Sequence, residues 1–147
     1  MGKRFKLEAL LNYRNILERE ARQELAGRIR TQEALLAEIN RQRAELEFLC
    51  RDFVQRQATG MSATDMRLFQ SNIQLRQQEL AAMEENLQQC NREVALARER
   101  LLKASQDKKS VEKLKDRHLQ EQQRLARQIE NRSLDEIALR RQNGGLA

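Results

Sequence analysis

The amino-acid sequence predicts an all-α fold, a long antiparallel two-helix coiled-coil hairpin with a C-terminal helical overhang. Apolar and small residues recur at alternating steps of three and four along most of the 147 residues, which is the repeat of a coiled coil. The chain has no proline, and its composition, 34% charged and 3% aromatic, is rich in strong helix formers. The repeat is interrupted at residues 58–62, so the chain is expected to reverse direction there.

The first helix is expected over residues 5–58. Three seam residues in this helix, Ala21, Leu25 and Ile29, are each separated by four positions, a stutter that locally relaxes the supercoil. Gly27 lies inside the stutter and costs about 1 kcal/mol relative to alanine in a helix interior. It marks either a bend or an exposed glycine that the helix tolerates. The full seam is expected at Leu10, Arg14, Leu17, Ala21, Leu25, Ile29, Gln32, Leu36, Ile39, Arg43, Leu46, Cys50 and Phe53.

The turn is expected at residues 59–62. Gly60 can adopt the positive φ that ends a helix, and Ser62 can cap the next helix with Asp65 in its first turn. Most of the large apolar side chains of this region are expected to pack together at the tip of the hairpin, with contact to a partner as the alternative. They are Phe48, Phe53, Met61, Met66 and Phe69.

The second helix is expected over residues 63–141, followed by a frayed tail at 142–147. Its seam is expected at Met66, Phe69, Ile73, Leu80, Met83, Leu87, Cys90, Val94, Ala97, Leu101 and Ala104. Facing residues of an antiparallel pair closed at this turn have numbers that add up to about 121. The first helix is therefore used up near residue 116, and about 25 residues of the second have no partner in the chain. Apolar side chains on this arm are typical of a docking element: Leu114, Leu119, Leu125, Ile129, Leu134 and Ile137.

Most of the excess positive charge lies in the last third of the chain. The net charge is +6, and residues 98–147 hold 13 lysines and arginines against 8 aspartates and glutamates. Such an arm predicts either an acidic partner or nucleic acid, with a solvated helix face as the alternative. Disorder of the whole chain is a further alternative for a sequence this charged, but the regular heptads favour a folded coiled coil.

Several chemical functions find no support in the sequence. There is no glycine-rich phosphate loop and no nucleophile beside a base, so we expect no enzyme activity and no cofactor. Cys50 and Cys90 fall far apart on the hairpin, which argues against a disulfide, and the single histidine, His118, is expected in solvent rather than at a metal. No segment has the apolar length of a membrane span or of a signal peptide.

Three segments of the chain carry recognisable motifs: Phe5–Arg14, residues 108–117 and residues 134–138. These motifs resemble those of the FliJ family of flagellar export proteins. The run Phe5–Arg14 resembles the family's opening Phe-x-Leu-x-x-Leu-Leu-x-Tyr-Arg, and residues 108–117 resemble its Glu-Lys-Leu-Lys signature, with Val111 where the family often has tryptophan. Residues 134–138 resemble its terminal Asp-Glu motif. The motifs occur in the order and at the distance of the family, on either side of a central turn.

This resemblance implies a non-enzymatic component of the flagellar type III protein export apparatus. Such a protein is a stalk-like coiled coil that binds the ring of the export ATPase (FliI type), modulates its assembly or activity, and links it to the export gate (FlhA type) and to export chaperones. It implies a cytoplasmic protein, peripheral to the inner membrane at the export apparatus. No nucleic acid and no membrane insertion are expected, whereas the overhanging arm allows self-association.

The resemblance also implies two sets of contact residues. The open-end cluster is expected to bind the ATPase and consists of Phe5, Leu7, Leu10, Tyr13, Arg14, Glu112, Lys113, Leu114, Lys115 and Arg117. The early second helix is expected to face the export gate through Leu68, Phe69, Ile73, Arg76 and Leu80. Seam packing is the alternative role of every apolar residue in both sets.

Two functions of other kinds remain open at this point. Stalks of virulence-type injectisome secretion systems have similar length and composition. A generic basic coiled-coil adaptor could use the arm on nucleic acid, although acidic residues interleave the arm and no aromatic platform accompanies it.

Overall fold

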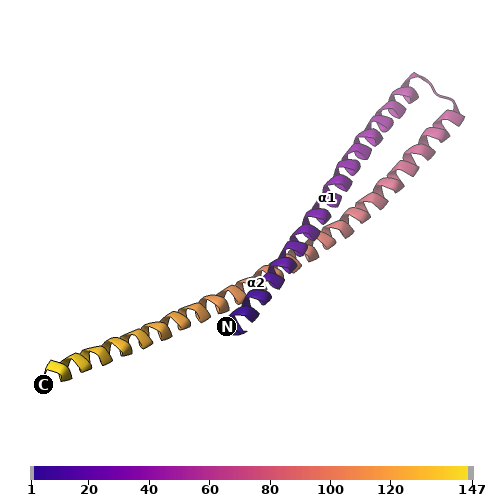
Figure 1. The fold of residues 1–147 in the computed structure, drawn as a ribbon. Coiled ribbons are helices and arrows are strands. Elements are labelled where there is room, and N and C mark those ends of the chain that lie inside the picture. The colour runs from indigo at the N-terminus through magenta and orange to yellow at the C-terminus, as the bar shows by residue number, and fades with distance from the viewer. Residues whose placement is uncertain (1, 146–147) are drawn as a thin grey trace. The chain divides into compact units, whose positions relative to one another are not determined.

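The computed structural model describes residues 2–145, which form two long helices joined by a short turn (Figure 1). Helix α1 spans Gly2–Thr59 and helix α2 spans Ala63–Gly145. Both helices are longer than the expected ranges 5–58 and 63–141. Residues 3–4 and 142–143 include no proline or glycine, so nothing stops either helix earlier, and residues 146–147 of the expected tail lie outside the described part.

The chain divides into two compact units. Unit 2 is Glu20–Leu102, and unit 1 combines Met1–Arg19 with Lys103–Ala147. Each unit contains a portion of α1 packed along a portion of α2. The described residues contain no strand, so the prediction of an all-α helical hairpin is confirmed.

The core of unit 2 is a narrow seam between the two helices. Ile39, Val94 and Ala97 are its buried side chains. The seam predicted for the second helix is confirmed within this unit, because each of its residues from Met66 to Leu101 is buried or half-buried.

Part of the seam predicted for the first helix is wrong. Leu36 is 43% exposed and Arg43 is exposed, whereas their neighbours Leu35 and Gln42 are half-buried. The steps of three and four around Ile39 run in the opposite order from the one expected, and both orders fit the same apolar pattern. Arg43 remains in water beside the seam.

The antiparallel register of unit 2 follows the prediction. The Arg28 Nη1 lies 2.9 Å from Glu93 Oε2, and Arg76 Nη1 lies 3.1 Å from Glu45 Oε2. Both pairs join residues whose numbers add to the expected value of about 121. Cys50 and Cys90 are free, half-buried thiols.

The turn has the predicted chemistry at its two ends. Gly60 has a φ of 101°, the left-handed region that glycine adopts without a steric cost. The backbone N–H of Asp65 donates to the Ser62 hydroxyl oxygen at 3.1 Å, so Ser62 caps α2. The rings of Phe53 and Phe69 stack with centroids 5.6 Å apart, which joins the helices just below the turn.

The prediction that Phe48 packs at the tip is wrong. Its side chain is 74% exposed. It lies two positions beyond Leu46, which is half-buried on the seam, and a step of two residues turns a side chain to the other side of a helix. An aromatic residue near the tip is therefore free to meet another molecule.

Helix α1 passes through Gly27 without interruption. The Thr31 hydroxyl donates to the Gly27 carbonyl oxygen at 3.1 Å, one turn further along the helix. A Cβ atom built on Gly27 would have no neighbour within 4 Å. The glycine is tolerated by a continuous helix, which was one of the two roles expected for it.

Unit 1 has a shorter seam. Val111 and Glu18 are buried, and the Lys108 Nζ lies 3.7 Å from Glu18 Oε2. The Arg14 Nη1 lies 3.4 Å from Asp107 Oδ2. Every residue from 119 to 144 is exposed, so the predicted overhang of α2 is present within this unit (Figure 1).

Candidate partner-binding surfaces

The two motifs of the open-end cluster meet in unit 1. Leu7 from α1 and Lys115 from α2 line one small groove, together with Arg4, His118, Leu119 and Gln122. His118, expected in solvent, is half-buried here because it follows Val111 and Lys115 along the seam of α2. The two segments expected to meet at the open end therefore lie side by side.

Only some members of the cluster are available to a partner. Phe5 is 73% exposed, and Tyr13 and Leu114 are about half exposed, so these three present apolar surface. Leu10 is close to the boundary of exposure, and Leu7 is half-buried. Exposed aromatic side chains such as Phe5 and Tyr13 are typical anchors of protein interfaces, and Leu114 adds apolar surface beside them.

The charged members of the cluster also differ in whether they are available to a partner. Arg14 is committed to unit 1, because it pairs with Asp107 and its Nε atom is buried. Glu112 lies 3.9 Å from the Lys108 ammonium group. Lys113 and Arg117 are exposed and form no ion pair among the described residues. The cluster thus offers three apolar side chains and two free cations.

The set expected to face the export gate is largely used inside unit 2. Phe69 stacks on Phe53, and Ile73 and Leu80 are half-buried on the seam. Arg76 is held by Glu45. Leu68, 64% exposed, is the member of the set that presents apolar surface.

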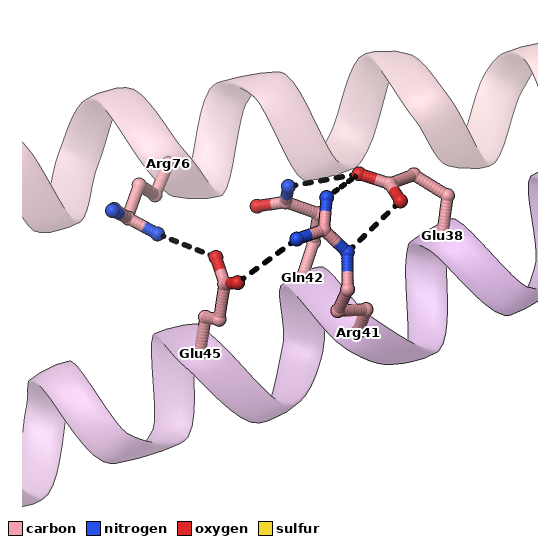
Figure 2. Close-up of polar contacts among 5 residues, drawn as sticks. All are labelled: Glu38, Arg41, Gln42, Glu45 and Arg76. Carbon is pink, nitrogen blue, oxygen red and sulfur yellow. Dashed lines mark hydrogen bonds and ion pairs between the residues drawn. The ribbon is translucent and has the colours of Figure 1, made fainter.

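A short polar network secures Arg76 (Figure 2). Arg41 donates two hydrogen bonds to Glu38 and one to Glu45, and Glu45 accepts a further hydrogen bond from Arg76 of α2. Gln42 also donates to Glu38, at 3.1 Å. The hydrogen bonds from Arg41 and then from Gln42 hold the pKa of the Glu38 carboxyl below its ordinary value of 4.5. The network links about two turns of α1 to α2 beside the seam.

Phe48 exposes apolar surface at a place where packing at the tip was expected. This side chain lines an open groove with Ala44, Glu45, Leu49 and Arg76. Its spacing from the seam carried the signal, because residue 48 falls outside the alternating steps that place Leu46 and Phe53 against α2. The groove puts an exposed aromatic ring next to the residues expected to face the gate.

Two absences among the described residues concern metal-ligand clusters and membrane-spanning helices. No group of three or more histidine, cysteine, aspartate or glutamate side chains between residues 2 and 145 is arranged to hold a metal ion. No described helix is long and apolar enough to cross a membrane.

The fold and these surfaces define a class of protein, a helical coiled-coil hairpin whose exposed side chains are suited to binding other proteins. The chain belongs to the FliJ family, since the family model of the flagellar FliJ protein matches residues 3–145. It is therefore a component of the flagellar type III export apparatus, and the family is a non-enzymatic one. A search of curated proteins and a search of solved structures found no match to the chain.

Proposed function

We propose that this protein is a stalk-like coiled coil that binds the export ATPase ring and modulates its assembly or activity. The proposal is carried by the family match over residues 3–145. The open-end cluster supplies the contact surface, because Phe5, Tyr13 and Leu114 expose apolar side chains from two helices within one unit. The same protein links the ATPase to the export gate and to export chaperones, in the cytoplasm beside the inner membrane.

The gate contact is assigned to the surface near Leu68 and Phe48. Both side chains are mostly exposed, whereas Phe69, Ile73 and Leu80 stabilise unit 2 from within. Mutation of the inner residues would remove packing as well as any partner contact. The exposed pair is therefore the appropriate place to test the gate.

The ATPase contact is tested by capturing the export ATPase of the same cell on the immobilised full chain and by measuring ATP hydrolysis in the mixture. The triple variant Phe5→Ala, Tyr13→Ala, Leu114→Ala is expected to weaken binding about 10-fold or more and to abolish any change in hydrolysis, because interface anchors carry most of the binding energy. The control is Leu96→Ala, an exposed leucine of unit 2 outside both sets.

Two results would contradict the ATPase contact: no capture by the wild-type chain, or equal capture by the triple variant with its helicity intact. The gate contact is tested separately, with the cytoplasmic domain of the export gate as the ligand. There, Leu68→Ala with Phe48→Ala should weaken binding while the open-end variant binds normally. The opposite pattern would exchange the two assignments.

A further inference from the structure

We infer that the outer face of α2 in unit 1 is a docking surface for an acidic helix of another protein. The surface, called the basic stripe below, consists of Lys109, Lys113, Arg117, Arg124 and Arg127. It rests on the proposed function only in sharing Lys113 and Arg117 with the open-end cluster. The other three cations were assigned no role by that proposal.

The basic stripe is a single helical face. Its residues follow one another at steps of four, four, seven and three, and at about 100° per residue these steps keep all five side chains on one side of α2. The opposite side of this stretch carries the buried Val111 and the half-buried Lys115 and His118. The stripe therefore points away from α1 and runs about 27 Å along the helix axis.

The five cations of the stripe are free to bind. Each is exposed, and none forms an ion pair within 4.0 Å among residues 2–145. By contrast, Arg14 and Lys108, which lie toward the seam of the same unit, pair with Asp107 and Glu18. Asp107 and Glu18 are thus placed against the seam cations, and the outer face, which also carries the exposed Asp116, keeps an excess of unpaired positive charge.

The remaining side chains on this face favour a protein over other polyanions. Gln106, Ser110, Asp116 and Gln120 occupy the positions between and beside the cations, so the face keeps a net positive charge but lacks the leucines and aromatics with which an amphipathic helix enters a membrane surface. No phenylalanine, tyrosine or tryptophan occurs between residues 103 and 127, so there is no platform on which the bases of single-stranded nucleic acid could stack. The ligand that this face favours is therefore a protein surface of complementary, negative charge.

The spacing of the cations matches a helix as the partner. Lys109, Lys113 and Arg117 rise by about 6 Å from one to the next, the same rise as that of glutamates placed at every fourth position of a second helix. Unit 2 shows this mode of contact, since Arg43 of α1 reaches Glu84 of α2 at 2.8 Å and Arg100 of α2 reaches Glu24 of α1 at 2.9 Å. Acidic residues at regular helical spacing are therefore the expected recognition signal.

The test measures binding of a fluorescent, capped helical peptide with glutamate at every fourth position and alanine or glutamine between, titrated with the full chain. The triple variant Lys113→Glu, Arg117→Glu, Arg124→Glu is expected to bind about 10-fold more weakly or worse, and wild-type binding should weaken as salt rises. The control is Arg67→Glu, Arg92→Glu, Arg98→Glu, which makes the same charge change on exposed, unpaired arginines of unit 2. Circular dichroism checks that both variants remain helical.

The inference is overturned if the control variant loses as much affinity as the stripe variant, because the effect would then be one of net charge. It is also overturned if a peptide of equal composition with its glutamates spread around the helix binds equally well. Tighter binding to a DNA duplex or to vesicles rich in phosphatidylglycerol, lost in the stripe variant, would assign the surface to those ligands instead. No export ATPase is present in this assay, so its failure leaves the proposed function standing, and failure of the ATPase experiment leaves this inference standing.

Discussion

Unit 2 and unit 1 are built from the same two helices but use their charged side chains differently. In unit 2 seven arginines are held by carboxylates, on the same helix or across the seam: Arg28, Arg41, Arg43, Arg51, Arg56, Arg76 and Arg100. In the described part of unit 1, the five cations of the basic stripe have no such partner. A hairpin needs its charges paired where two helices recognise each other, whereas a surface that recognises another protein must keep them available.

The two units also differ in how deeply their apolar side chains are buried. Unit 2 contains the fully buried Ile39 and the stacked rings of Phe53 and Phe69, which join the helices on either side of the turn. Unit 1 exposes Ile129, Leu134 and Leu139 along the overhang of α2, where every described residue from 119 to 144 is exposed. The stability of unit 2 is therefore expected to come from packing, and that of the end of unit 1 from helix propensity and from partners.

The largest expected effect contrasts the two units directly. Ile39→Ala removes a side chain that is 0% exposed, so the free energy of unfolding should fall by about 2–4 kcal/mol. Ile129→Ala removes a chemically identical side chain that is 66% exposed in unit 1, and should change the free energy by less than about 0.5 kcal/mol. Urea unfolding followed by circular dichroism measures both. Equal losses would mean that the arm is packed as firmly as the seam.

The turn provides the next effect. Gly60→Ala places a side chain at a φ of 101°, where an L-residue is strained, and should destabilise the protein by about 1–2 kcal/mol. The measurement is the melting temperature. An unchanged value would show that the turn shifts without cost and that the hairpin of unit 2 does not depend on its glycine.

Gly27 is the matched control for that substitution and is expected to act in the opposite direction. It lies in the interior of α1, and a Cβ atom there meets no neighbour. Gly27→Ala should therefore stabilise the protein by about 0.5–1 kcal/mol, through a better helix propensity and a more restricted unfolded chain. A lower melting temperature for this variant would reveal a bend in α1 that alanine does not permit.

A smaller effect tests whether the charge pairing of unit 2 contributes to its stability. A double-mutant cycle with Arg76→Met and Glu45→Gln should give a coupling energy of about 0.2–1 kcal/mol, since both side chains are partly exposed and the pair spans the two helices. The measurement is urea unfolding at low and at physiological salt. A coupling energy of zero at both salt concentrations would mean that the Arg76–Glu45 pair helps to set the register of the helices but does not stabilise the fold.

The smallest effect is the pH dependence due to Glu38. Its pKa in the folded protein lies below 4.5, so its contribution to stability is present above that pH and is lost as the pH falls through the lowered folded value. Melting temperatures of the wild type and of Glu38→Gln should therefore differ at neutral pH and converge in acid. A constant difference down to the acid limit would contradict the role of Arg41 in holding this carboxylate ionised.

The sequence by itself determined the class of fold, the position of the turn and the family. Proline-free heptads leave a long helix as the favoured conformation, and Gly60 with Ser62 supplies the local chemistry that separates two helices. These are local properties, decided by each residue and its neighbours within a turn or two. The antiparallel register follows from them, because a short turn leaves the second helix one direction of return.

The tertiary structure alone decided which side chains face inward. Leu35 and Leu36 are chemically identical neighbours, and only contact with α2 selects Leu35 for the seam, because steps of three and four can alternate in either order. Contact with the other helix likewise decided between the two roles expected for Arg14 and Phe69, which lie on the seam rather than on a partner surface, and left Phe48 outside. The freedom of the basic stripe is decided in the same way, since whether a cation is paired depends on which carboxylates the facing helix brings within reach.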